Sequence, residues 1–276
     1  MADYNMAKID EVWTDEDLVS GYLDGVRKAT PMAEEEIDVM LHLIRLTIPR
    51  KVRAFLDLGC GDGALGRPIL KKYPQAKGVF LDFSDTMLDA ARKEIPHRNG
   101  NIFFLKKDFS KRSWVNSVVG YGKFDVIVSG NAIHHQTDKR KKEIYKEIFD
   151  LLVPGGLFIN SEHVAYPSEW LEKAFDEYFI NSLYKYHRAN NPKQKRSSIA
   201  RDYYGSPGTK ADILAALDKQ CLWLQEIGFI EVDCYLKVFS LAMFGGIKPK
   251  KTARFPRNSA SVMTDMRKSY RLSVQI

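Results

Sequence analysis

The chain has 276 residues, of which 45% are hydrophobic and 28% are charged, close to the averages of globular domains, so a disordered or collagen-like chain is excluded. It contains no run of eighteen apolar residues and no signal-peptide core at its N-terminus, so we expect no attachment to a membrane. The three cysteines, Cys60, Cys221 and Cys234, lack metal-ligand spacing and give no disulfide framework, which suits a cytoplasmic protein.

The net charge of +7 is concentrated at the C-terminal end of the chain. Residues 248–276 hold eight Lys or Arg residues and one acid, Asp265, while the rest of the chain carries 34 basic and 34 acidic groups. A neutral body with a basic tail gives no support to a general nucleic-acid-binding surface, although a local patch stays open.

The first fifty residues predict two helices. Thr14 precedes an acidic turn and is expected to cap the first helix, which runs from Leu18 to Val26. Thr30-Pro31 predicts the start of the second, with proline at the first helical position. We interpret residues 1–50 as a helical lid.

Short apolar runs alternate with amphipathic segments from Arg53 to Ile159. The runs predict strands at Ala54–Leu58, Gly78–Asp82, Ile102–Leu105, Phe124–Ser129 and Gly156–Ile159, and helices are expected at Thr86–Glu94 and Lys139–Leu152. Strands that alternate with helices indicate a parallel sheet covered on both faces.

Residues 164–210 interrupt this rhythm with an insert that is rich in tyrosine and dotted with Lys and Arg. Asn190-Asn-Pro and Gly205-Ser-Pro-Gly predict turns inside it. A helix over Ile213–Ile227, ended by Gly228, and two strands at about Ile230–Leu236 and Phe239–Phe244 are expected to follow. Residues 248–276 show no sustained periodicity and are interpreted as a basic tail.

A glycine-rich segment, Gly59-Cys-Gly-Asp-Gly63, directly follows the first predicted strand. Glycines let the backbone approach a ligand, and the N-terminus of the next helix supplies unpaired N–H groups. Gly61, Gly63 and Gly66 match the dinucleotide-binding pattern, with an acid, Asp82, at the end of the next strand. Alone, this pattern leaves open a dehydrogenase or a non-catalytic nucleotide-binding protein.

Further polar residues favour a ligand that carries a positive charge. Asp57 lies inside the strand before the glycine segment, where its carboxylate would repel a pyrophosphate. Asp82, Asp108, Ser129 and Asn131 stand at the ends of successive strands, which line one crevice in an open parallel sheet.

Over about residues 50–163 and 211–247 the chain resembles a class I S-adenosylmethionine-dependent methyltransferase. Five segments carry the resemblance in order: Phe55–Gly63, Asp82–Met87, Lys107–Phe109, Phe124–His135 and Leu152–Gly156. The resemblance implies an α/β fold with a doubly wound, mostly parallel seven-stranded sheet (Rossmann-like), an antiparallel last strand, and S-adenosyl-L-methionine as the cofactor.

The resemblance also implies which residues bind the cofactor. Asp82 would hold the ribose hydroxyls, Phe83 would cover the adenine, and Asp108 would accept from the adenine amino group. The full set is Asp57, Gly59, Cys60, Gly61, Asp82, Phe83, Met87, Asp108, Phe109, Ser129 and Asn131.

His134 and His135 are the candidate catalytic residues. They follow the fourth predicted strand, where this family places the methyl acceptor, and a neutral imidazole there could take a proton from an N–H or O–H nucleophile. We expect one histidine to act chemically and the other to pack, His134 being the packing residue; the alternative is that neither is catalytic.

Four potential metal ligands meet at the same edge of the sheet: His134, His135, Glu162 and His163. Histidines with a carboxylate can bind a transition metal, but strand ends commonly collect polar residues, and no metal site is predicted.

The insert lies where the family places its substrate cap. Its tyrosines suit an aromatic acceptor and its Lys and Arg residues an anionic one, although a solvated surface explains these charges equally well. The sequence therefore predicts an N-terminal lid (1–50), a methyltransferase domain with a substrate-cap insert (51–247, insert 164–210) and a basic tail (248–276). The predicted function is methyl transfer to a small molecule; the alternatives are a tRNA- or rRNA-modifying enzyme and a non-catalytic cofactor-binding protein.

Overall fold

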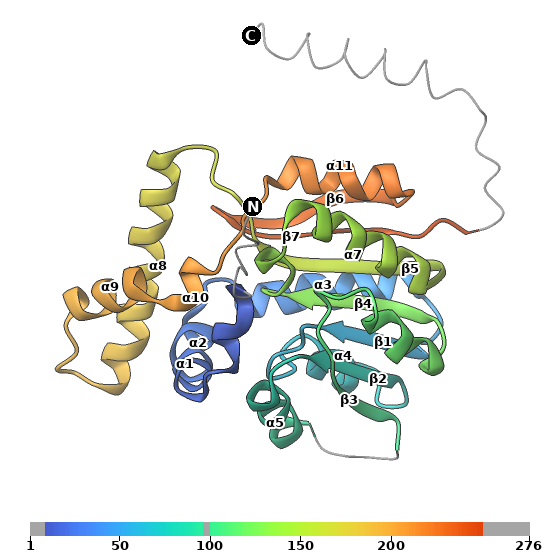
Figure 1. Cartoon of the computed structure of the whole chain (residues 1–276), viewed down its shortest axis with the longest axis horizontal. Helices are drawn as coiled ribbons and strands as arrows, with labels where there is room; N and C mark the ends of the chain where they lie inside the picture. Colours follow the sequence, from blue (N-terminus) through green and yellow to red (C-terminus); the bar gives the residue numbers. More distant parts are fainter. Residues whose placement is uncertain (1–8, 96–99, 251–276) are drawn as a thin grey trace, which may run out of the picture.

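The structure is a computed structural model that describes residues 9–95 and 100–250 (Figure 1). Its centre is a seven-stranded sheet in the order β3-β2-β1-β4-β5-β7-β6. The strands are β1 (Ala54–Leu58), β2 (Lys77–Asp82), β3 (Ile102–Lys106), β4 (Phe124–Gly130), β5 (Leu152–His163), β6 (Ile230–Val238) and β7 (Leu241–Ile247).

The sheet confirms the predicted fold class. Strands β1 to β5 are parallel, and β7 runs antiparallel to both β5 and β6. The strand order reverses between β1 and β4, and ligands bind in the crevice outside the carboxyl ends of the strands at such a point.

Helices cover both faces of the sheet because its strands are apolar on both sides. One face packs against α3 (Ala33–Thr47), α4 (Gly66–Lys72) and α5 (Asp85–Glu94), and the other against α6 (Trp114–Val118), α7 (Asp138–Leu151) and α11 (Leu217–Ile227). In β1, Phe55 belongs to the first core, whereas Leu56 and Leu58 belong to the second.

The N-terminal segment differs in detail from the expected two helices. It forms η1 (Ile9–Thr14) and then a nearly unbroken helical run of α1 (Glu16–Gly21), η2 (Tyr22–Val26) and α2 (Arg27–Ala29). Asp15, not Thr14, caps this run, because its carboxylate accepts from the N–H of Leu18 at 2.8 Å.

The second helix, α3, starts later than Pro31 because Met32 has a left-handed backbone with φ of 63°. Its residues Met40 and Ile44 are fully buried against the sheet. Within residues 9–50, α3 thus packs on the sheet, and the segment from η1 to α2 is the part that lies beside the insert (Figure 1).

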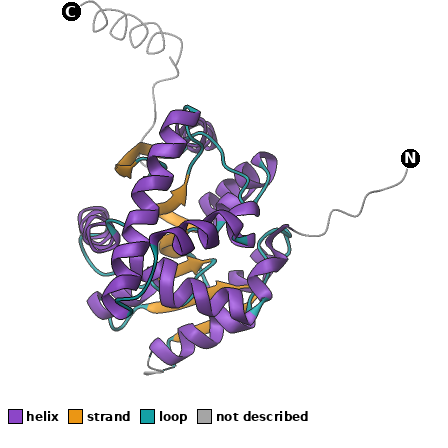
Figure 2. Cartoon of the chain, turned by 90° about the vertical axis from the view of Figure 1, so that its left-hand side faces the viewer, coloured by secondary structure: helices purple, strands orange, loops and turns teal. Residues whose placement is uncertain are grey.

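The insert folds into α8 (Glu169–Asn190), α9 (Arg196–Gly205) and α10 (Pro207–Lys210). It lies beside the N-terminal run, off the ends toward which the parallel strands point (Figures 1 and 2). Ala29 packs with Phe175, Phe179, Ile180, Leu183 and Ile199. We call η1 to α2 together with α8 to α10 the helical cap.

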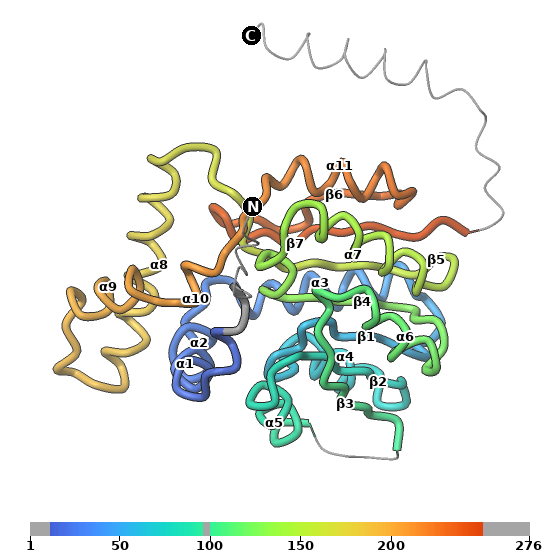
Figure 3. The backbone as a smooth tube through the Cα atoms, in the orientation of Figure 1, coloured from blue at the N-terminus to red at the C-terminus, as the bar shows by residue number. Residues whose placement is uncertain are grey.

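The helix expected at Ile213 begins at Leu217 instead. Tertiary bonds hold the preceding residues in a loop: Ile213 N–H donates to the carbonyl of His134 at 3.1 Å, and its own carbonyl accepts from Lys141 Nζ. The backbone trace in Figure 3 shows this loop as the return from the cap to the sheet.

Two further predictions concern membrane-spanning helices and the basic tail. No helix among residues 9–95 and 100–250 is long and apolar enough to cross a bilayer. Most of the expected basic tail, residues 251–276, lies outside the described part of the chain. Lys248, at its start, is bonded to the body through its N–H and the carbonyl of Gly156 at 2.9 Å.

Candidate active site

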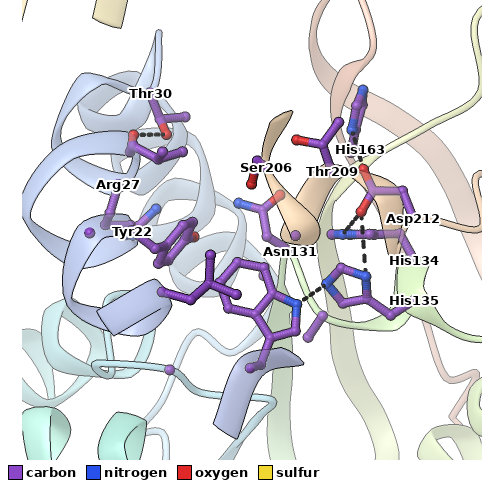
Figure 4. A pocket seen from close by; sticks show the side chains of 18 of the residues that line it. Tyr22, Arg27, Thr30, Asn131, His134, His135, His163, Ser206, Thr209 and Asp212 are labelled. Carbon is purple, nitrogen blue, oxygen red and sulfur yellow. Dashed lines mark hydrogen bonds and ion pairs between the residues drawn. The ribbon is translucent and has the colours of Figure 1, made fainter. Parts of the chain in front are cut away.

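A cavity of about 910 Å³ opens at the carboxyl ends of the parallel strands, beneath the helical cap (Figure 4). One end is formed by the loops after β1 and β2, and the other by the loops after β4 and β5 together with α8 to α10. Residues from the sheet and from the cap thus share one cavity.

The glycine loop after β1 has the backbone that its sequence predicts. Gly59 and Gly61 have φ of 67° and 51°, in the left-handed region that favours glycine. A Cβ atom on Gly59 would also lie only 2.4 Å from the Cβ of Ala132. The loop therefore packs closely against the loop after β4, and its residues line the cavity.

Two buried carboxylates hold this loop. Asp82 at the end of β2 accepts from the N–H groups of Gly61 at 2.9 Å and Ser84 at 3.0 Å. Asp57 in β1 accepts from the N–H of Gly66 at 2.8 Å. Each oxygen of Asp82 still has acceptor capacity for a ligand, since a carboxylate offers about four lone-pair sites.

Burial controls the charge of both acids. It raises the pKa of Asp57 to about 8, opposed by the hydrogen bond from Gly66. It also raises the pKa of Asp82, opposed by the bonds from Ser84 and Gly61. A cationic ligand beside Asp57 would favour the ionised carboxylate, which fits the positive sulfonium group of S-adenosylmethionine.

Most of the residues expected to bind the cofactor lie in the cavity wall: Asp57, Gly59, Cys60, Gly61, Asp82, Phe83, Met87, Phe109 and Asn131. Asp108 instead lines a neighbouring hollow, which Phe83 shares, and its carboxylate accepts from the N–H of Ser110 at 2.8 Å. Ser129 is fully buried and donates its hydroxyl to the carbonyl of Leu58 at 2.7 Å.

His134, on the short helix η4 (Ile133–His135), is bonded on both ring nitrogens. Its Nδ1 lies 2.5 Å from Glu162 Oε2, and its Nε2 lies 3.2 Å from Asp212 Oδ1. Burial opposes a charge on this ring, but the two carboxylates outweigh it and raise the pKa of His134 to about 9. His134 is therefore a cation at neutral pH and has no free lone pair.

His135 has the opposite character. Its Nε2 accepts from the indole N–H of Trp13 at 3.0 Å, and its Nδ1 lies 3.3 Å from the carbonyl of Ala211 (Figure 4). A carbonyl only accepts, so Nδ1 carries the proton and Nε2 the lone pair. Burial, reinforced by the charge of His134, lowers the pKa of His135 to about 3. The ring is neutral and, because its pKa is low, a weak base.

Two residues of this site carry no sequence signal. Asp212, in the loop after α10, bonds His134 and also lies 3.2 Å from Nδ1 of His163. These bonds lower the pKa of Asp212, although burial alone would raise it. Trp13 reaches His135 from the N-terminal segment. Both residues join the site only through tertiary contacts.

Of the four candidate metal ligands at this edge, His134 and Glu162 bond each other, whereas His135 and His163 bond other residues. In the described part of the chain, His134, His135 and Asp212 bring ligand atoms within 4.8 Å. Glu162 is engaged by His134 and by the N–H of Ile133 at 2.8 Å. The arrangement is a charged hydrogen-bond network.

Comparisons with known proteins agree with this geometry. Residues 56–158 match a family described as a methyltransferase domain. Carboxy-S-adenosyl-L-methionine synthase from Nitratiruptor sp. is 26% identical over 167 residues, which cover 60% of this chain and 66% of that protein. Malonyl-[acyl-carrier protein] O-methyltransferase from Halalkalibacterium halodurans is 33% identical over 138 residues, 50% of this chain and 49% of that protein.

The chain thus spans between about half and two thirds of the length of these two curated relatives. Among solved structures, magnesium protoporphyrin IX methyltransferase from Synechocystis PCC 6803 has a similar fold, with a TM-score of 0.51 at 14% identity over 81% of this chain and 85% of that one. Together, the fold, the glycine loop and the family match show that residues 56–158 lie in a methyltransferase domain with the class I, Rossmann-like fold.

Proposed function

We propose that this chain transfers the methyl group of S-adenosylmethionine to a small-molecule acceptor held under the helical cap. The observation that carries the proposal is the single cavity, which runs from the glycine loop and Asp82 to His135 and the cap. Its volume of about 910 Å³ is near the upper end for ligand pockets, which favours room for two ligands.

The chemistry of the cofactor is methyl donation from its sulfonium group, and the protein must supply position and proton transfer. Asp82 would hold the nucleoside, with Phe83 and Met87 against its adenine. His135 would accept the proton that an O–H or N–H acceptor loses as its new bond to the methyl carbon forms. Since Nε2 has one lone pair, Trp13 must first withdraw its N–H.

The cap end of the cavity favours an acceptor with an apolar or aromatic body. Its wall includes Phe175, Phe179, Leu183, Ile199 and Tyr203. Aromatic rings stack well on flat apolar ligands, and a closed cap excludes water from the reacting groups.

An RNA acceptor is the second candidate, because some curated relatives are named as ribosomal RNA methyltransferases and the C-terminal end of this chain is basic. Binding to RNA that weakens steeply with salt and disappears when residues 251–276 are deleted would favour it.

We also propose that the protein is located in the cytoplasm, where its three free cysteines would stay reduced.

The test is calorimetry with S-adenosylhomocysteine and with NAD, followed by turnover of labelled S-adenosylmethionine with pooled metabolites. We expect the protein to bind S-adenosylhomocysteine but not NAD, and to transfer the labelled methyl group to a small molecule. Binding of NAD instead, or transfer only to RNA, would contradict the proposal.

A further inference from the structure

The N-terminal helical run contains one π turn, η2, and this turn faces the cavity. The N–H of Arg27 bonds the carbonyl of Tyr22, five residues earlier instead of four. In an α-helix, residues five apart point to different sides, whereas the wider turn brings Tyr22 and Arg27 to the same side. Both line the cavity, and Figure 4 shows them on the wall opposite His134 and His135. Single π turns are frequent at functional sites.

Arg27 is half-buried in the cavity wall, yet its guanidinium has no hydrogen bond or ion pair with any described residue. Arg140, the buried arginine of α7, contrasts with it, because it bonds both Glu147 and the carbonyl of Phe109. A guanidinium has five N–H donors, and shielding it from water without an acceptor is costly. Arg27 is therefore available to an anion in the cavity.

A half-buried acid of opposite charge lines the same cavity. Glu36, on α3, accepts from the hydroxyl of Ser161 on β5. Burial raises the pKa of Glu36, and the nearby charge of Arg27 partly lowers it again. Nevertheless, no ion pair within 4.0 Å joins these two described residues. The hydrogen bond from Ser161 holds the Glu36 carboxylate at its place in the cavity wall, and the π turn holds Arg27 at a separate place in the same wall.

Two opposite charges, held apart in one cavity, match a group that carries both charges itself. Arg27 lines the cavity together with Asp57 and the glycine loop, and its charge partly offsets the effect of burial, which raises the pKa of Asp57. Among the parts of the proposed ligands, the α-amino acid end of the cofactor has this chemistry.

We infer that Arg27 and Glu36 bind the amino acid end of S-adenosylmethionine, with the guanidinium on its carboxylate and the Glu36 carboxylate on its ammonium group. This inference rests on the proposed function. It assigns the N-terminal half of the cap to the cofactor and leaves α8 to α10 for the acceptor. The cofactor would then tie the N-terminal run to the body of the protein.

Calorimetry with two nucleosides tests the inference: S-adenosylhomocysteine, which has the amino acid end, and 5′-methylthioadenosine, which lacks it. Arg27→Gln and Glu36→Gln should each weaken S-adenosylhomocysteine by about 10- to 100-fold, the usual effect of losing a charge-assisted hydrogen bond. The affinity for 5′-methylthioadenosine should not change.

Matched controls come from the same helices. Lys28→Gln removes the neighbouring charge, which is exposed, paired with Asp24 and outside the cavity wall, and Glu35→Gln removes an exposed acid one position before Glu36. Neither should alter either affinity. The unaltered protein should also bind decarboxylated S-adenosylhomocysteine about 10- to 100-fold more weakly than the complete ligand, a measurement that needs no variant.

Unchanged binding of S-adenosylhomocysteine to Arg27→Gln and Glu36→Gln would overturn this inference but not the proposed function. An equal loss of both nucleosides, or equal affinity of the unaltered protein for the decarboxylated ligand, would overturn it as well. If the unaltered protein binds none of these nucleosides, the proposed function fails, and the two failures are thereby distinguished.

Discussion

At the scale of single residues, His134 and His135 are neighbours in the chain whose surroundings drive their charges in opposite directions. Glu162 and Asp212 stabilise the cation on His134. The indole N–H of Trp13 and the carbonyl of Ala211 require the neutral ring on His135. The sequence predicts one chemical and one packing histidine, and this geometry favours His135 for the chemical role.

Replacing each histidine tests this division. His135→Ala should lower turnover by roughly 100-fold or more, a typical general-base contribution, while the affinity for S-adenosylhomocysteine stays the same. His134→Gln should mainly lower the melting temperature, because Glu162 and Asp212 lose their cationic partner. Steady-state kinetics and thermal melting would measure both; normal turnover in His135→Ala would refute its role as the base.

The same pair predicts how stability depends on pH. The pKa of His134 rises from 6.5 to about 9 on folding, so its contribution is complete below pH 6.5 and is lost as the pH rises toward 9. The pKa of His135 falls to about 3, so its contribution is complete above pH 6.5 and is lost as the pH falls toward 3.

We therefore expect these two residues to favour maximal stability near pH 6.5. Urea unfolding across the pH range should show a shallower alkaline decline in His134→Gln and a shallower acid decline in His135→Gln. Identical pH profiles for both variants and the unaltered protein would contradict the assigned charge states.

Asp82 offers a test of the cofactor end of the cavity. Asp82→Ala should remove a charge-assisted bond to the ribose worth about 2–3 kcal/mol, and so weaken S-adenosylhomocysteine by roughly 30- to 150-fold. Asp108→Ala should weaken it less, because Asp108 lies beside the cavity and not in its wall. Calorimetry measures the affinity of each variant for S-adenosylhomocysteine, and melting curves check that the glycine loop, which Asp82 also holds, stays folded. An affinity of Asp82→Ala equal to that of the unaltered protein would exclude the ribose contact.

At the scale of elements, the short helix η1 reaches the chemical centre from the far N-terminal side. Its Trp13 contacts Tyr22 edge to face at 5.1 Å between ring centres and donates to His135. A Cβ atom on Gly208 of α10 would lie 2.9 Å from the Trp13 ring, so the two halves of the cap meet at this indole. Movement of η1 would therefore free His135 and open the cap together.

Trp13→Phe should keep the ring but remove the N–H donor. The Nε2 lone pair of His135 then becomes free, and its modification by diethyl pyrocarbonate should become faster. Peptide mass spectrometry measures this at His135, with the exposed His42 as an internal control whose rate should not change. An unchanged rate at His135 would mean that the Trp13 bond does not protect it.

At the scale of the whole molecule, the end of the described chain is attached to the body of the protein through Lys248. Lys248 donates through Nζ to the carbonyls of Phe149 at 2.7 Å and Leu152 at 2.9 Å. The predicted basic tail thus begins with a residue that is anchored to the body.

Deleting residues 251–276 should leave the melting temperature unchanged, as expected for a tail beyond the last strand. Lys248→Ala should lower the melting temperature. Each lost hydrogen bond costs about 1 kcal/mol, and each kcal/mol corresponds to about 2–4 °C. Differential scanning calorimetry of both proteins is sufficient. A large loss on deletion alone would show that residues 251–276 also pack on the body.

The sequence by itself determined the fold and the glycine loop, because local patterns encode both. Strands such as Ala54–Leu58 are apolar on both faces, Ser84 and Thr137 cap the helices that follow them, and Gly59 adopts a backbone that disfavours other residues. Met32 and the bonded loop at Ile213 each displaced an expected helix start, and both act through conformation or contacts that periodicity does not encode.

The tertiary structure alone decided which side chains share the site and what charge they carry. Trp13 and His135 are 122 positions apart, and Asp212 meets the histidines only after the insert has folded back onto the sheet. Charge depends on burial and on neighbours within a few ångströms, so adjacent histidines can acquire a cation and a neutral base. Likewise, the pattern of residues 14–31 indicates helices, but only the π turn puts Tyr22 and Arg27 on one side, facing the cavity.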